Sequence, residues 1–168
     1  MPFLVPWTDA IGKPGFVEGF VAYHREQREA WRPGAWHLLL GVSAGGELAG
    51  IQGIEGKDFA ECRDVNTGSW LGQRFQGRGL GTEMRAAVLE FAFRGLGAET
   101  ARSGAIAGNV ASARVSEKLG YERDEDGVAA PRGEPVCEQR FRLERSRWRA
   151  PVPVELEGLE PCLPLFGL

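Results

Sequence analysis

One glycine-rich segment carries the residue types and spacing most suited to chemistry. Residues 76–82 (QGRGLGT) lead into an amphipathic stretch that predicts a helix. Glycines let the backbone turn tightly and let a ligand approach it, and the first turn of a helix offers unpaired N–H groups and about half a positive charge. The segment therefore predicts a site for a phosphate or diphosphate, to which Arg74 and Arg78 add positive charge. The alternative is a glycine-rich turn that only joins two elements.

Two common phosphate-binding motifs do not fit this segment. A P-loop ends in Gly-Lys followed by Ser or Thr, and residues 73–82 contain no lysine. The dinucleotide fingerprint GxGxxG, started at Gly77, requires a glycine where the sequence has Thr82. The segment therefore disfavours an ATPase, a GTPase or a dinucleotide-binding domain.

A third pattern fits both this segment and a second one downstream. Gln76-x-x-Gly79-x-Gly81 resembles the Q/R-x-x-G-x-G/A diphosphate loop of the GNAT superfamily of acyl-CoA-dependent N-acyltransferases. Residues 109–121 (NVASARVSEKLGY) are similar to the N-x-x-S…E-K-x-G-F/Y segment of the RimJ/RimL-like branch. Residues 36–143 can be aligned with the order of elements in this family. By this resemblance the chain is identified as a member of the GNAT superfamily, RimJ/RimL-like branch.

The resemblance implies an acetyl-CoA-dependent N-acetyltransferase. In such an enzyme a primary amine attacks the thioester directly in a ternary complex, without a metal ion or a covalent enzyme intermediate. The acceptor would be a protein N-terminus, an amino acid or a small molecule, antibiotics included. Three alternatives stay open: an acyltransferase with a longer donor such as succinyl-CoA, a non-catalytic acyl-CoA-binding or interaction module, and an unrelated nucleotide-binding α/β protein.

The resemblance also implies how acetyl-CoA is held. The N–H groups of residues 78–82 would bind the diphosphate. The strand that ends at Trp70 and Leu71, with Gly68 marking a bulge or a close backbone approach, would diverge from the strand at 100–107 and leave room for the pantetheine arm. A bulge N–H near Trp70 or Leu71 would stabilise the thioester oxyanion, and Asn109 would bond the pantetheine arm. The implied coenzyme-binding residues are Trp70, Leu71, Gln76, Gly77, Arg78, Gly79, Leu80, Gly81, Thr82, Asn109 and Ser112.

Ser112 is the implied general acid. It stands where the RimJ/RimL-like branch has a serine thought to protonate the departing thiolate, and water is its competitor. Many GNAT enzymes use a tyrosine seven residues after the asparagine, where this sequence has Ser116, which we expect to be a packing residue. Asn109 and Ser112 also flank the start of a predicted helix, so that either can instead be its cap.

The general base is harder to assign. Relatives often place a glutamate where this chain has Asn66, whose amide cannot take up a proton at neutral pH. Asp64 lies on the same strand face and could act through a water molecule, whereas Glu55 and Glu61 are weaker candidates. The predicted catalytic residues are therefore Ser112, Asp64 and Asn66.

A weak base favours an acceptor that is already partly neutral. At pH 7 an α-amine with a pKa of about 7.7–8.0 is neutral in about one molecule in ten, and a lysine amine with a pKa of about 10.4 in about one in 2,000. General-base catalysis is worth about 10²–10⁴-fold, so an enzyme with a poor base loses less on α-amines. We therefore expect a protein N-terminus or an amino acid as acceptor, with small-molecule amines still open.

The periodicity of the chain predicts an α/β domain. Hydrophobic spacing predicts helices at residues 16–31, 81–94 and 110–119. Short apolar or alternating runs predict strands at 36–42, 48–54, 65–71, 100–107, 121–123 and 136–143, with loops at 58–63 and 124–134. The resemblance implies a mixed, mostly antiparallel central sheet flanked by helices. Only about 15 residues precede the first helix, too few for the family's usual first strand and helix. Either that strand is missing and a sheet edge is exposed, or the chain starts inside the domain.

Length and composition predict a single globular domain. The 168 residues divide into a domain at 1–149 and a Pro-rich apolar tail at 150–168 that docks on the domain or on a partner, including a second copy in a homodimer. A net charge of −3, from 20 basic and 23 acidic residues, argues against nucleic acid as a partner, and no apolar run reaches the about 20 residues of a membrane span. Three scattered cysteines form neither a disulfide framework nor a CxxC pair, so we expect a cytoplasmic protein. His24 and His37 are isolated in the sequence, so we expect no metal site and two ordinary surface or core histidines.

Overall fold

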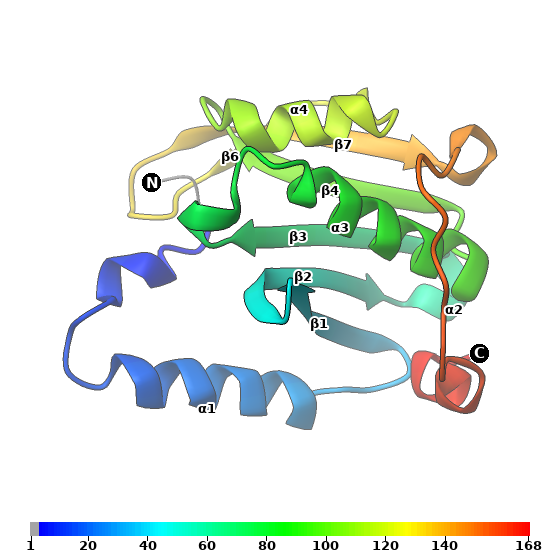
Figure 1. The fold of residues 1–168 in the computed structure, drawn as a ribbon, viewed down its shortest axis with the longest axis horizontal. Coiled ribbons are helices and arrows are strands. Elements are labelled where there is room, and N and C mark those ends of the chain that lie inside the picture. The colour runs from blue at the N-terminus through cyan, green and yellow to red at the C-terminus, as the bar shows by residue number, and fades with distance from the viewer. Residues whose placement is uncertain (1–3) are drawn as a thin grey trace.

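The structure, a computed structural model, describes residues 4–168, so that the first three residues of the predicted domain lie outside it. Seven strands form one sheet in the order β1-β2-β3-β4-β7-β5, and β6 also pairs with β7 (Figure 1). Each strand pair is antiparallel except the pair of β3 and β4. The predicted mixed, mostly antiparallel sheet flanked by helices is therefore confirmed.

Most elements lie close to their predicted positions. The strands are β1 (Ala35–Ala44), β2 (Glu47–Lys57), β3 (Asp64–Leu71), β4 (Thr100–Ile106), β5 (Glu122–Arg123), β6 (Gly127–Ala129) and β7 (Val136–Glu144). The α-helices are α1 (Phe16–Glu29), α2 (Phe59–Cys62), α3 (Leu80–Glu90) and α4 (Val110–Lys118). The 3-10 turns are η1 (Trp7–Ala10), η2 (Gln73–Phe75), η4 (Arg145–Arg147) and η5 (Glu160–Phe166), and a π-helical turn, η3 (Phe91–Gly95), continues α3.

Two predicted loops contain regular structure. Residues 58–63 include α2, whose Phe59 is buried against Trp36 with ring centroids 5.4 Å apart. Residues 124–134 include β6, a three-residue strand that pairs with β7. The prediction of loops is wrong here because one buried aromatic residue, or three residues at a sheet edge, are too few to produce a periodic pattern.

The two faces of the sheet carry different elements. Helices α3 and α4 cover one face (Figure 1), where alternate residues such as Val65, Thr67 and Ser103 are buried. Helix α1 packs beside β1, and η1 reaches the opposite face, where the ring centroids of Trp7 and Trp70 are 5.4 Å apart. The hydrophobic core on the α3 side includes Ile54, Leu89, Phe93, Phe141 and Leu143.

Strands β3 and β4 pair over only part of their length. Their parallel register begins with Asp64 opposite Thr100 and ends with Thr67 opposite Ser103. Beyond that point β3 stays paired with β2 alone and β4 with β7 alone. The predicted divergence of these two strands is therefore confirmed, and each strand has one open backbone edge along the gap between them.

The backbone bulge expected near Trp70 or Leu71 is absent. Strands β2 and β3 pair without a register shift along the whole of their common length. Gly68, which also indicated a bulge, keeps the strand regular and leaves open space, because a Cβ added there would meet no atom within 4 Å. An oxyanion donor on this strand must therefore be an N–H group of regular backbone.

The tail at 150–168 packs against the rest of the chain, and its end lies beside the start of β1 (Figure 1). Trp31 Nε1 donates a hydrogen bond to the carbonyl oxygen of Leu165 at 2.7 Å. The ring of Phe166 is buried among those of Trp31, Trp36 and Phe91, with centroids 5.2, 4.9 and 5.8 Å away. The boundary between residues 149 and 150 and a homodimer formed through the tail stay predictions.

Replacing Phe166 by alanine is expected to lower the free energy of unfolding by about 3–5 kcal/mol, because it removes a buried aromatic ring from the core. Phe166 is 4% exposed and the neighbouring Leu165 is 55% exposed, so Leu165→Ala is the matched control and should change this free energy by less than about 0.5 kcal/mol. Urea unfolding followed by tryptophan fluorescence measures both. Equal stability of the two variants would show that the tail does not complete the core.

Candidate active site

The glycine-rich loop forms the start of α3. Gly79 is the N-cap of this helix with a φ of 86°, and Gly77 has a φ of 71°. Both values lie in the left-handed region, which glycine adopts without strain. A Cβ added to either glycine would meet no atom within 4 Å, so the outer side of the loop is open. A ligand can therefore come close to this backbone.

Consecutive backbone donors in the loop have no acceptor within residues 4–168. The N–H groups of Thr82 and Glu83 donate to the carbonyl oxygen of Gly79, at 2.9 and 3.1 Å, as the helix begins. The predicted donor set at 78–82 is therefore shortened by Thr82, whose N–H is engaged. The donors that stay open belong to Arg78, Gly79, Leu80 and Gly81. Four N–H groups at a helix start are suited to an anion.

The two arginines of the loop differ in their availability. Arg78 is exposed and makes no ion pair within the described part of the chain. Arg74 pairs with Glu47 at 3.1 Å and lies over the ring of Phe75, 4.7 Å from its centroid. Arg74 would therefore have to give up its pair with Glu47 to meet a phosphate, whereas Arg78 has no ion pair within the described residues to break.

Gln76 ties the loop to the end of β3. Its Nε2 donates to the carbonyl oxygen of Leu71, the last residue of that strand, at 2.9 Å. The Leu71 side chain reaches toward Gly81, where an added Cβ would lie 3.7 Å from Leu71 Cδ1. Trp70 turns its ring to the other face, against Trp7, so that its backbone rather than its side chain borders the gap.

Asn109 caps helix α4. Its Oδ1 accepts a hydrogen bond from the Ser112 N–H at 3.2 Å, so the capping alternative is confirmed for this residue. The Ser112 hydroxyl is half-buried and has no hydrogen-bond partner within residues 4–168. Ser116 is buried, as expected for a packing residue, and its hydroxyl is also without a partner there.

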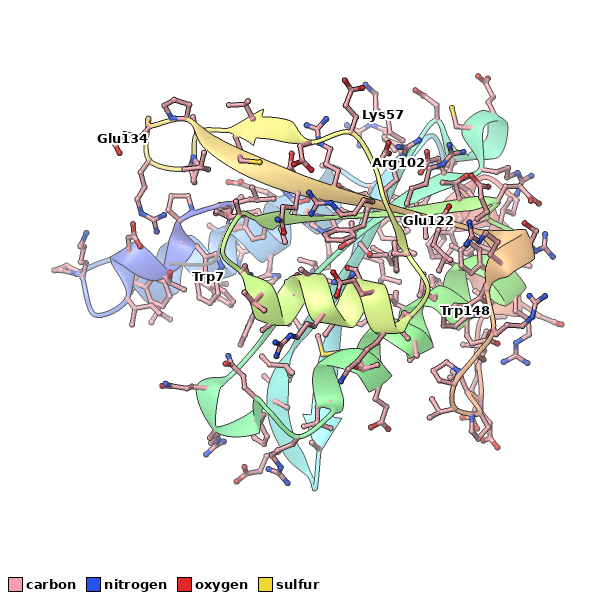
Figure 2. The ribbon with its side chains drawn as sticks, turned by 90° about the horizontal axis from the view of Figure 1, so that it is seen from above. Trp7, Lys57, Arg102, Glu122, Glu134 and Trp148 are labelled. Atoms are coloured by element: carbon pink, nitrogen blue, oxygen red, sulfur yellow. The ribbon has the colours of Figure 1, made fainter. Side chains whose placement is uncertain are left out.

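A cavity of about 690 Å³ borders the sheet face opposite α3 and α4, within the about 300–1,000 Å³ of typical ligand sites. Strand register places His37, Glu55, Asn66 and Arg102 next to one another in a row across β1 to β4. All four residues line the cavity together with Asp64. Figure 2 shows Arg102 on the side of the sheet away from α4. The cavity therefore collects ionisable side chains from four strands.

The carboxylates of this cavity have different partners. Arg102 donates to Asp64 from Nε at 2.6 Å and to Asp124 from Nη1 at 3.0 Å, and these contacts, the Asp64 hydrogen bond foremost, raise the pKa of the Arg102 guanidinium. Asn66 Nδ2 donates to Glu55 Oε1 at 2.8 Å. Asp64 is therefore held by a cation, whereas Glu55 is oriented by a neutral amide.

Position along the strands also separates the two carboxylates. Asn66, the register partner of Glu55, stands one residue before the last pair of β3 and β4, whereas Asp64 stands three residues before it. At about 3.3 Å per residue, Asp64 is about 10 Å from the point of divergence. Asp64 can therefore act there only through intervening water, as the sequence interpretation supposed.

His37 is a cavity residue that sequence reasoning set aside as isolated. Its Nδ1 lies 3.0 Å from Gln27 Oε1. Burial lowers the pKa of its imidazole, with Glu55 acting in the opposite direction and His24 in the same direction. The ring is therefore neutral at pH 7. Its neighbours come from α1 and another strand, so spacing along the chain contains no signal for them.

The sequence profile of the acetyltransferase (GNAT) domain matches residues 6–122. The chain belongs to the GNAT acetyltransferase family. The spermidine N-acetyltransferase from Vibrio cholerae, in complex with CoA and spermine, shares the fold with a TM-score of 0.62 at 15% identity, over 79% of this chain and 76% of that one. The ribosomal-protein-S5-alanine acetyltransferase from Vibrio fischeri does so with a TM-score of 0.63 at 14% identity, over 81% and 74%.

GNAT acetyltransferases use acetyl-CoA, and the residues of this chain fit that donor. The four open N–H groups and Arg78 suit its diphosphate, and the open edges of β3 and β4 suit an arm with amide groups. Within residues 4–168 no group of three or more His, Cys, Asp or Glu side chains is arranged to hold a metal ion. No helix in that range is both long and apolar enough to cross a lipid bilayer.

Gly79→Asp is expected to weaken CoA binding by at least about 100-fold, because two unit charges 4 Å apart repel by about 4 kcal/mol at an effective dielectric constant of 20. Gly79→Asn is the control, since it has the same size, tolerates a positive φ and carries no charge. Isothermal titration calorimetry with CoA measures both affinities. Equal affinities would mean that no phosphate lies at the start of α3.

The depressed pKa of His37 predicts a pH-dependent stability. A folded-state pKa below the unfolded value of about 6.5 means that the unfolded chain binds more protons, so this stabilisation is present above about pH 6.5 and is lost as the pH falls below it. His37→Gln should therefore lose less stability than the wild type between pH 7.5 and 5.5, measured by urea unfolding at both values. An identical pH dependence of the two proteins contradicts this.

Proposed function

We propose that this protein is an acetyl-CoA-dependent N-acetyltransferase of the RimJ/RimL-like branch that acetylates a primary amine. One observation supports this most. The N–H groups at the start of α3 are open on one face, and the gap between β3 and β4 begins at Thr67, one residue beyond Asn66, which lines the ionisable cavity of the opposite face. A donor held on the helix side can therefore meet an acceptor from the other side, as direct transfer in a ternary complex requires.

The reaction needs one proton acceptor and one proton donor, which lie on opposite faces of the sheet. On the cavity side Glu55, oriented by Asn66, accepts the proton that the amine loses, directly or through water, as its nitrogen forms the C–N bond. On the helix side the Ser112 hydroxyl gives a proton to the thiolate sulfur as the C–S bond breaks, with water as the alternative donor. One proton enters Glu55 and one leaves Ser112, and exchange with solvent restores both groups.

The charges of the cavity favour a cationic acceptor. Three acidic residues, Glu55, Asp58 and Asp64, and two basic ones, Lys57 and Arg102, line it, and Asp64 is paired with Arg102. Because a carboxylate is a weak base, an α-amine with its pKa of about 7.7–8.0 is a better acceptor than a lysine side chain. The acceptor class we propose is therefore a protein N-terminus or an amino acid. A polyamine is the second candidate, because a structural neighbour was solved with spermine.

An acceptor screen tests this function. Wild-type protein is incubated with acetyl-CoA and, in turn, N-terminal peptides, amino acids, spermine and aminoglycosides, and the released thiol is measured. We expect thiol release with peptides or amino acids. CoA binding without turnover on any amine would instead favour a non-catalytic acyl-CoA-binding module, and turnover only with succinyl-CoA would assign a different acyl donor.

With the best acceptor, Glu55→Gln should lower kcat by about 100-fold, the usual loss when a general base is removed. Asp64→Asn, which changes the neighbouring carboxylate to an isosteric amide, should lower it by less than about tenfold, because Asp64 is already held by Arg102. Steady-state kinetics from pH 6 to 9 provide the comparison. A larger loss for the Asp64 variant would reverse the assignment of the base.

A further inference from the structure

Helix α3 buries an arginine that has no acidic partner. Arg85 is 3% exposed. Its Nη1 donates to Ser103 Oγ at 2.8 Å, its Nη2 donates to Ser69 Oγ at 3.2 Å, and its Nε has no partner among the described residues. No carboxylate within residues 4–168 forms an ion pair with it. Burying a cation without a counter-charge costs free energy. A negative charge on a bound ligand would therefore stabilise this guanidinium.

Arg85 marks the closed end of the gap between β3 and β4. Ser103 belongs to the last pair of these strands, opposite Thr67, and Ser69 lies two residues beyond Thr67 on β3. Both serines stand on the sheet face that α3 covers. Arg85 also follows the N-cap Gly79 by six residues, which is about 9 Å along the helix axis. The guanidinium is therefore placed inside the gap, on the helix side, beyond the proposed diphosphate site.

A second polar side chain near this point also has an atom without a partner among residues 4–168. Gln52, opposite Ser69 in the β2–β3 register, is buried with an unpartnered Oε1. The hydroxyl of Tyr121 lies 3.3 Å from Thr67 Oγ1, which belongs to the last residue pair of β3 and β4. Buried polar atoms are nearly always paired. The unpartnered Oε1 of Gln52 and Nε of Arg85 therefore indicate the place of a polar or charged group of a ligand.

We propose that Arg85 is a further catalytic residue whose guanidinium stabilises the thiolate that leaves when the acyl-CoA thioester is cleaved. This proposal rests on the proposed function. The amine nitrogen forms the C–N bond, the C–S bond breaks, and its electron pair goes to the sulfur. Glu55 receives the proton of the amine, and the sulfur stays ion-paired with Arg85 until Ser112 or water protonates it.

The charges of the two faces select the sulfur over an acyl carboxylate as the partner of Arg85. The transferred acyl group must reach the amine beside Glu55, whose carboxylate is bonded by the neutral amide of Asn66 and would repel a second carboxylate. The sulfur can stay on the helix side, where Arg85 is the cation and the described neighbours, Ser69, Ser103 and Gln52, are neutral. The acyl chain we expect is therefore neutral.

The pKa of the thiol of bound CoA measures the effect of the Arg85 guanidinium, because a nearby positive charge stabilises the thiolate. Free CoA, titrated in the same buffer, gives the reference pKa of this thiol. In the wild-type complex we expect the pKa of the CoA thiol to be lower by at least about one unit, which corresponds to about ten times more thiolate at a pH well below the pKa. The thiolate is followed by its ultraviolet absorbance during a pH titration, and the complex with desulfo-CoA is the blank. Arg85→Met should remove this shift and lower kcat by about 100-fold, and should change the calorimetric affinity for desulfo-CoA by less than about threefold. Arg85→Lys, which keeps the charge, should retain most of the shift.

The outcomes separate this proposal from the function on which it rests. If the pKa of the CoA thiol is the same in the wild-type complex as in free CoA, the role of Arg85 is refuted without the need for a variant. The role is also refuted if the thiol pKa stays lowered in Arg85→Met. It is refuted in favour of acyl-group recognition if Arg85→Met lowers kcat only with succinyl-CoA as donor. In each of these cases CoA is bound, so the proposed function survives. Wild-type protein that does not bind CoA refutes both.

Discussion

The early end of the pairing between β3 and β4 is the constraint on which the site depends. The two strands part after Thr67 and Ser103, although each keeps its other neighbour. Backbone N–H and C=O groups require partners, and along this gap the chain supplies none from the facing strand. A linear ligand with its own amide groups meets that requirement without further change in the fold.

The same divergence keeps opposite charges apart. On the helix side are the open N–H groups at the start of α3, the free Arg78 and the buried Arg85, all positive or partly positive. On the cavity side are Glu55 and Asp64, with Arg102 holding the latter. Under the proposed function, the anionic donor would lie on the helix side and the amine acceptor on the cavity side, and the two would meet at the gap.

Local features of this architecture could be predicted from the sequence, and cross-strand features could not. The loop at residues 76–82 and the helix after it follow from glycine positions and hydrophobic spacing, which act over a few residues. His37, Glu55 and Arg102 become neighbours only through strand register, which spacing along the chain does not encode. Arg85 lies within a largely apolar helix, and periodicity does not show which serines of the sheet it meets.

A crystal structure of the protein with bound CoA tests the central claim most directly. The account predicts diphosphate oxygens within hydrogen-bond distance of the N–H groups at residues 78–81, and the pantetheine arm along the open edges of β3 and β4 with its sulfur near Arg85. Coenzyme bound elsewhere on the chain, or a closed gap with β3 and β4 paired to their ends, would contradict it.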